Sequence, residues 1–372
     1  MDFNKIFIKD ACPTKIGGQA VLEGIMMKGE DRTAVAVRLP DDSIYIKTQK
    51  LKARGKWFKV PIVRGVLIFV DSLVTGMKTL MLSAELLTEY DEEADDEEAQ
   101  TMDASASTAE PETKPAEAAD AVPTKKDKQK SSSTGMTISL ILSVAIAILF
   151  TIGIFVIAPT WVVNLLDPWV KSEILKNLIE GVFRILLFVL YVLLISRMKD
   201  IQTVFQFHGA EHECIHCFEG GLDLTPANCQ QFETLHPRCG TSFLMFVMVI
   251  ALLLFSLLGW PDLLFRIGSR LVLIPVIAGL SYELLRWAGS STSPVVKILS
   301  VPGLLLQKLT TMKPNDKQLE VAIASMKAVL VPAEAPVIDG LCDLNGELIP
   351  EEEVLSDEEA AEKATIDAGG GI

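Results

Sequence analysis

Residues 136–158 read MTISLILSVAIAILFTIGIFVIA, an apolar run without a charged side chain. A helix of about 20 such residues crosses the hydrocarbon core of a bilayer. A second run, FLMFVMVIALLLFSLLGW, fills most of residues 239–261. The chain of 372 residues is 49% hydrophobic, which is too apolar for an ordinary soluble domain. The two runs therefore predict a membrane α-helical fold.

Two weaker segments complete a predicted set of four transmembrane helices. Residues 177–196 carry Glu180 and Arg184, which stand four positions apart and can pair on one helix face. Residues 271–285 carry Glu283 as their only charged side chain. We expect both segments to cross the membrane while facing protein neighbours.

The distribution of positive charge predicts how these helices are oriented. Four lysines lie between residues 125 and 130, immediately before the first apolar run. Such residues stay in the cytoplasm, and four crossings return the C-terminus to the same side. No signal peptide is predicted, because the N-terminus has no apolar core. We expect a multi-pass protein of the inner (plasma) membrane with both termini in the cytoplasm and the lipid bilayer as partner.

The net charge of −14 comes from two segments. Residues 89–135 contribute −9 and residues 333–372 contribute −11, so the rest of the chain is net positive. Acidic, solvated segments of this kind are typical of disorder and can recruit a soluble protein partner. Nothing in the charge pattern supports binding of a nucleic acid, whereas a net-positive body suits a surface of anionic lipid.

The chain divides into six predicted segments. They are a small β-rich cytoplasmic unit (1–60), an amphipathic interfacial helix (61–88), a disordered acidic linker (89–135), a four-helix transmembrane region (136–290) with a metal-site-like loop at 204–242, an interfacial segment with an amphipathic helix (291–331), and a disordered acidic tail (332–372). Alternating residues at 33–39 and 44–47, joined by a turn, predict a hairpin in the first segment. A re-entrant or fifth span is the alternative for 61–88.

All four histidines of the chain fall within residues 208–236. His208, His212 and His216 follow one another at intervals of four, so neighbouring pairs project from one face of a helix. Glu211 lies on the same face, within about one turn of His208. Two histidines at this spacing can hold one divalent ion, as in helical zinc sites.

The fourth histidine belongs to a second half-site, His236-Pro-Arg-Cys239-Gly240. It resembles the turn of a zinc ribbon, with histidine in place of the first cysteine. The candidate metal ligands are His208, His212, His236, Cys239, Glu211 and His216. A mixed nitrogen and sulfur set suits zinc best, and iron or manganese less well. The alternative is a group of histidines packed at the junction between a helix and the membrane.

His212, Glu213 and His216 also match the His-Glu-x-x-His pattern of metalloproteases, in which the glutamate is the general base. The pattern is short, and Glu213 points away from the face of His208 and Glu211. We therefore expect Glu211 to be the catalytic carboxylate. A membrane-embedded protease of this type remains an alternative.

With these residues, the chain resembles the YqhQ-like family, uncharacterised bacterial membrane proteins predicted to be metal-dependent enzymes. The likeness rests on GGQAVLEGIMMKG (17–29), on HGAEH and HPRCGTSF in the histidine region, and on residues 61–84 and 316–330. It implies metal-site positions at His208, Glu211, His212, His236 and Cys239. The family pattern often has a basic residue where this chain has Glu213, which implies that the protease-like match is coincidental.

Two functions follow from these observations. The first is a cytoplasm-facing, metal-dependent hydrolase in which Glu211 is a ligand or a general base. The second is a non-enzymatic membrane scaffold or assembly factor pinned by a structural zinc site. Three protein ligands would favour catalysis, whereas four would favour the structural role.

Overall fold

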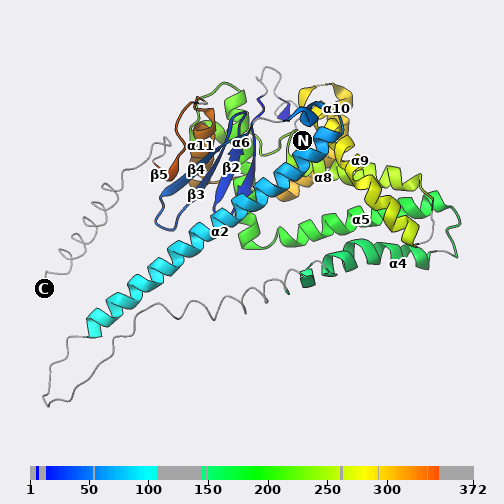
Figure 1. Ribbon diagram of the computed structural model, residues 1–372, viewed down its shortest axis with the longest axis horizontal. Helices are drawn as coiled ribbons and strands as arrows, with labels where there is room; N and C mark the ends of the chain where they lie inside the picture. Colours follow the sequence, from blue (N-terminus) through cyan, green and yellow to red (C-terminus); the bar gives the residue numbers. More distant parts are fainter. Residues whose placement is uncertain are drawn as a thin grey trace, which may run out of the picture. The chain divides into compact units, whose positions relative to one another are not determined.

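The computed structural model describes residues 6–7, 14–52, 55–106, 142, 145–147, 149–166, 168–259, 263–291, 293–332 and 334–342. Most of these residues are helical (Figure 1). The chain forms two compact units, of which the first comprises Met1–Asp91, Val189–Ala251 and Pro261–Ile372. The second comprises Glu92–Phe188 and Leu252–Trp260. All candidate metal ligands belong to the first unit.

The first unit contains a five-stranded antiparallel sheet in the order β1-β2-β3-β4-β5. The strands are β1 (Gly17–Val21), β2 (Gly24–Lys28), β3 (Arg32–Arg38), β4 (Ile44–Lys50) and β5 (Asp339–Cys342). The predicted hairpin is confirmed, since β3 and β4 pair from Arg38–Ile44 to Arg32–Lys50. Asp41 stabilises its turn by accepting the backbone N–H of Ser43 at 2.9 Å.

The last strand lies where the sequence predicts a disordered tail over 332–372. Cys342 of β5 is opposite Ile44 of β4, and Asp339 forms an ion pair of 2.9 Å with Lys47. A four-residue strand in an acidic segment has too little alternation to be recognised, and only the free edge of β4 gives it a partner. Residues 343–372 lie outside the described residues. The recruitment of a soluble partner by this tail therefore stays a prediction.

Both faces of the sheet are covered by helices, because the strands alternate apolar side chains between two cores. On one face, Ile25, Met27 and Ala36 pack with α6 (Lys199–Glu219) and α11 (Asp316–Leu330). On the other, Val21, Met26, Val35 and Val37 pack with Leu82, Leu86 and Leu87 of α2. The sheet thus joins N-terminal, central and C-terminal parts of the sequence into one layered body (Figure 1).

Helix α2 (Val63–Ala106) is longer than the predicted helix over 61–88. It continues into the predicted acidic linker, where Glu, Ala, Gln and Met are all good helix formers. Residues 107–135 of that linker lie outside the described residues. An ion pair of 2.7 Å between Lys28 and Asp71 also ties the helix to β2.

Within the described part of the chain, four helices are long and apolar enough to cross a membrane: Val63–Tyr90, Ala145–Leu165, Glu173–Ile195 and Phe265–Ser290. The last three overlap predicted spans, and the first falls on residues 61–88, where a fifth span is the alternative. The predicted span over 239–261 contains the apolar helix α8 (Gly240–Ser256), which is shorter than these four. In the structure these segments correspond to α2, to η2 (Gly153–Ile157) with α4 (Ala158–Leu165), to α5 (Glu173–Ile195) and to α9 (Leu263–Ser290). The predicted pair of Glu180 and Arg184 is confirmed at 2.9 Å.

Three further helices lie between these elements along the chain. They are η1 (Lys56–Lys59), α7 (Pro226–Cys229) and α10 (Pro294–Thr310). The side chain of Ser293 caps α10, and that of Asn315 caps α11 in a reciprocal capping box with Gln318. Helix α11 thus lies within residues 291–331, where the sequence predicts an amphipathic helix, and most of its residues are buried.

Candidate metal centre

Helix α6 carries His208 and His212 on one face, with ring centroids 4.5 Å apart. Gly209 between them faces the segment that follows α10. A Cβ atom at this position would lie 2.0 Å from the carbonyl oxygen of Met312. Glycine at 209 therefore lets that segment cross α6 closely and brings the end of α10 beside His208.

Both imidazole rings are oriented by backbone carbonyls. Nδ1 of His208 lies 2.8 Å from the carbonyl oxygen of Thr310, and Nδ1 of His212 lies 2.5 Å from that of Thr234. A carbonyl can only accept, so each Nδ1 carries the proton and each Nε2 presents a lone pair. Histidines that bind metal are held in this way, with the second nitrogen donating to a carbonyl or carboxylate.

Cys239 completes the group from the start of α8. Its Sγ lies 3.0 Å from Nε2 of His208, and it accepts the backbone N–H of Thr241 at 3.4 Å. The hydroxyl of Thr241 is 3.2 Å from the same sulfur. The sulfur of Cys239 thus lies at the amino end of α8, close to the N–H and O–H groups of Thr241.

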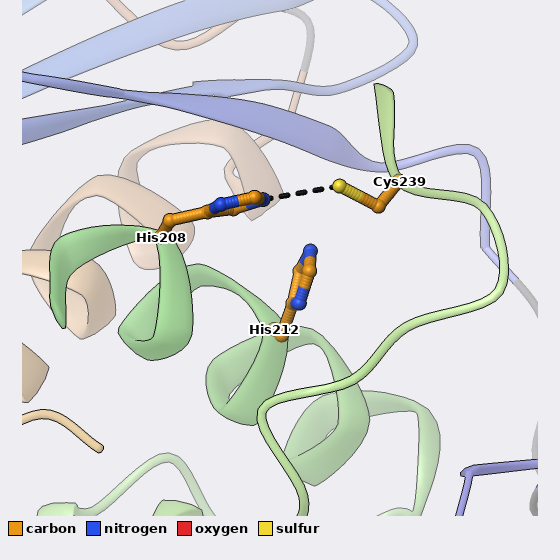
Figure 2. Close-up of side chains that lie close together, drawn as sticks. All are labelled: His208, His212 and Cys239. Carbon is orange, nitrogen blue, oxygen red and sulfur yellow. Dashed lines mark hydrogen bonds between the residues drawn. The ribbon is translucent and has the colours of Figure 1, made fainter. Parts of the chain in front are cut away.

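Figure 2 shows His208, His212 and Cys239 converging from the helix and the loop before α8. Their three ligand atoms all lie within 4.8 Å of one another. Nε2 of His212 is buried and has no hydrogen-bond partner among the residues that the structure describes. A buried lone pair without a partner costs free energy unless a hydrogen-bond donor or a metal ion occupies the position in front of it. Two imidazoles and one thiolate are a ligand set that zinc prefers, so these residues fit a metal ion.

Glu211 lies beside this cluster, and its carboxylate is outside the group of convergent ligand atoms. Its Oε1 accepts the backbone N–H of Gly18 in the edge strand β1 at 2.7 Å. Burial raises the pKa of Glu211, while His208 and the Gly18 N–H act in the opposite direction. A buried carboxyl with a raised pKa is suited to hold or transfer a proton.

The two remaining histidines sit at the other end of the cluster, and their ring nitrogens face protein groups. Nε2 of His216 donates to the carbonyl oxygen of Leu235 at 3.0 Å, and the two nitrogens of His236 each lie 3.4 Å from donors of Arg238. Burial lowers the pKa of His216 to about 4 and holds that of His236 well below its usual range. Both rings are thus neutral and packed, with centroids 4.7 Å apart.

Gln307 of α10 is a functional candidate that the sequence reading missed. Its fully buried amide accepts the backbone N–H of His236 and donates to the carbonyl oxygen of the same residue, both at 2.8 Å. It also donates to the hydroxyl of Ser242 at 2.9 Å. One side chain therefore holds the turn that delivers Cys239. A lone glutamine on the buried face of an apolar helix was the available signal.

Arg238 fixes the same turn from the other side. It donates to the carbonyl oxygen of Thr14 at 2.9 Å and to the carboxylate of Glu219 at the end of α6. Glu219 also accepts the backbone N–H of Thr14 at 2.7 Å. This charge-assisted network links the N-terminal segment, α6 and the turn before α8.

The His-Glu-x-x-His pattern does not form a convergent site. Glu213 is fully buried and pairs with Lys313 at 2.7 Å, with its second oxygen unpartnered. Burial raises the pKa of Glu213 to about 7. The predicted membrane carboxylate Glu283 is also engaged elsewhere, since its Oε1 accepts Nε of Arg64 at 2.6 Å.

Comparisons with known proteins agree with the resemblance. Residues 60–331 match the family described as "Protein of unknown function (DUF1385)". The chain is 33% identical over 326 residues to "Uncharacterized protein YqhQ" of Bacillus subtilis (strain 168), covering 87% of this chain and 94% of that protein. No solved structure matches. Neither description names a metal or a reaction, so the expectation of a metal-dependent enzyme gains no support from them. The chain belongs to the DUF1385 family.

Proposed function

We propose that the protein is an integral membrane protein with a cytoplasm-facing site for one divalent metal ion, most suitably zinc. The ligands are Nε2 of His208, Nε2 of His212 and Sγ of Cys239. The observation that carries this proposal is the unpartnered, buried Nε2 of His212, which faces two further ligand atoms within 4.8 Å. The proposed chemistry is metal-dependent hydrolysis.

The arrangement supports a catalytic site more than a closed structural one. Three protein ligands leave a coordination position open, as in catalytic zinc sites. A bound ion would supply Lewis acidity there. Glu211 lies on the same helix face and is held by Gly18 of β1, where it can accept a proton and pass it on.

A structural zinc site is the second candidate, and one observation favours it. The ring of His236 lies 5.5 Å from that of His212, centroid to centroid, so a change in its side-chain orientation would offer a fourth ligand. Its contacts with Arg238 oppose this, because one ring nitrogen of the neutral imidazole can accept from Arg238 and a new orientation would break that contact.

Metal analysis and ligand exchange test both candidates. We expect the purified protein to contain about one equivalent of zinc and the Cys239→Ala variant to contain little. In the cobalt-substituted protein, added azide should change the visible spectrum if a position is open. A spectrum that azide leaves unchanged would favour the four-ligand structural site. Equal zinc in wild type and Cys239→Ala would show that the cluster is not the metal site.

The membrane placement that we propose keeps the four predicted crossings, with α8 in place of α2. The contacts of α2 support this. Asp71 pairs with Lys28 of β2, and a Cβ atom at Gly76 would lie 2.3 Å from Oε1 of Gln19 of β1. The middle of α2 therefore runs along the sheet, while Leu73, Met77 and other apolar side chains on its opposite face stay exposed. A helix with one covered face and one exposed apolar face is typical of the membrane interface.

The position of the linker after α2 tests this topology. We expect a cysteine introduced at Ser107, in a chain whose native cysteines are replaced, to react only with a reagent that enters the cytoplasm. An α2 that crosses the membrane would place residue 107 outside instead. A cysteine at Lys171, between α4 and α5, is the control that should be labelled from outside.

A further inference from the structure

A basic and aromatic segment precedes α2 and takes no part in the metal centre. Residues 50–59 read KLKARGKWFK, with five basic side chains and no acidic one. Lys52, Lys56 and Lys59 are exposed, and none of them forms an ion pair with any residue that the structure describes. Two exposed lysines elsewhere in the first unit, Lys15 and Lys317, do have carboxylate partners. The positive charge of Lys52, Lys56 and Lys59 is therefore available to a ligand.

Trp57 makes this segment more than a solvated charge run. It lies in the short helix η1, which buries none of its residues, and its own side chain is 69% exposed. A large indole ring in water leaves apolar surface exposed, whereas at a membrane interface its ring meets acyl chains and its N–H stays hydrated. An exposed tryptophan among unpaired lysines fits an interface better than bulk water.

The residues that follow η1 place it beside a candidate membrane helix. The backbone N–H of Ile62 donates to Glu283 of α9 at 3.3 Å, and Arg64 pairs with the same carboxylate. A Cβ atom at Gly279 of α9 would lie 2.7 Å from the carbonyl oxygen of Ile62. The chain therefore meets α9 in direct contact, only three residues after Lys59. The contact lies at Gly279 and Glu283, in the C-terminal half of the candidate span Phe265–Ser290.

We propose that Lys52, Lys56, Lys59 and Trp57 form a binding site for the headgroups of anionic phospholipids, with the three lysines as the phosphate ligands and Trp57 as the interfacial anchor. The inference rests on the proposed membrane placement of α9. Each basic residue near an anionic surface contributes about fivefold in affinity. The exposed apolar face of α2 begins directly after this site, so lipid contact continues from headgroup to acyl chain along one surface.

The test uses the purified full chain in neutral detergent micelles, titrated with brominated phosphatidylglycerol or brominated phosphatidylcholine. Bromine quenches tryptophan on contact, and subtraction of the Trp57→Phe variant isolates the signal of Trp57. We expect quenching at a lower mole fraction of phosphatidylglycerol than of phosphatidylcholine. Replacing Lys52, Lys56 and Lys59 by Gln should raise the phosphatidylglycerol midpoint by about fivefold for each lysine removed. The phosphatidylcholine midpoint should stay the same.

The matched control replaces three lysines that have carboxylate partners, Lys15, Lys47 and Lys317, by Gln. It should titrate like the wild type. Equal midpoints for the two lipids, no quenching of Trp57, or an equal shift in the control would each overturn the headgroup site. Cell fractionation separates this result from the larger proposal. A wild-type chain in the soluble fraction would overturn the membrane placement itself, whereas a membrane-bound chain with equal midpoints overturns only the headgroup site.

Discussion

The two ends of the histidine cluster carry the same residue type in different states. At one end, His208 and His212 donate from Nδ1 to backbone carbonyls and turn Nε2 toward the cluster, where Nε2 of His208 contacts the sulfur of Cys239. At the other end, Nε2 of His216 donates to the carbonyl oxygen of Leu235, and Nε2 of His236 contacts the guanidinium group of Arg238. The difference teaches that a histidine's role depends on which nitrogen its surroundings protonate, and much less on its spacing along the helix.

The largest expected difference between the two ends is in metal content. His212→Ala removes a ligand and should reduce bound zinc from about one equivalent to almost none. His216→Ala should leave zinc unchanged but lower the free energy of unfolding by about 3 kcal/mol, because it creates a cavity and leaves the Leu235 carbonyl unpaired. Elemental analysis and thermal unfolding measure the two effects. Loss of zinc in both variants would abolish the distinction between the ends.

An intermediate effect is expected from Gln307, which supports the turn between the two ends. Gln307→Met keeps the volume of the side chain but removes both hydrogen bonds to the backbone of His236. We expect zinc affinity to fall by about 10- to 100-fold, the range found for residues that orient metal ligands. Competition with a zinc-sensitive dye measures this.

The matched control for Gln307→Met is Ser300→Ala on the same buried face of α10. Ser300 bonds only within its own helix, to the carbonyl oxygen of Val296 at 2.9 Å. Its replacement should leave zinc affinity unchanged. An equal fall in both variants would mean that α10 acts through general packing.

The smallest expected effect is at Arg238, which belongs to the structural end. Arg238→Lys keeps the charge but cannot reach Thr14 and Glu219 with two nitrogens at once. We expect the free energy of unfolding to fall by about 1.5 kcal/mol with no change in zinc content. Lys15→Gln, which breaks an exposed pair with Glu30, should cost about 0.5 kcal/mol or less. A loss of zinc in Arg238→Lys would show that Arg238 also supports the metal-binding end of the cluster.

Local patterns in the sequence were sufficient for several elements. The alternation over 33–39 and 44–47 predicts β3 and β4, because this signal acts between residues near in sequence. The clustering of histidines likewise predicts where a metal site can lie. Long apolar runs identify candidate spans for the same reason, since length and hydropathy are properties of one segment.

Only the tertiary structure decided which candidate ligands converge. The choice among six residues depends on the carbonyls of Thr234 and Thr310, the amide of Gln307 and the backbone of Gly18, which come from separate parts of the chain. The pairing of Glu283 with Arg64 and the addition of β5 to β4 likewise depend on contacts between residues far apart in the sequence. The sequence alone determined that the histidines lie together. Contacts across 22 and 102 positions of sequence, to the carbonyls of Thr234 and Thr310, determined which of their nitrogens face the cluster, because tautomer and burial are set by neighbours that only the fold brings close.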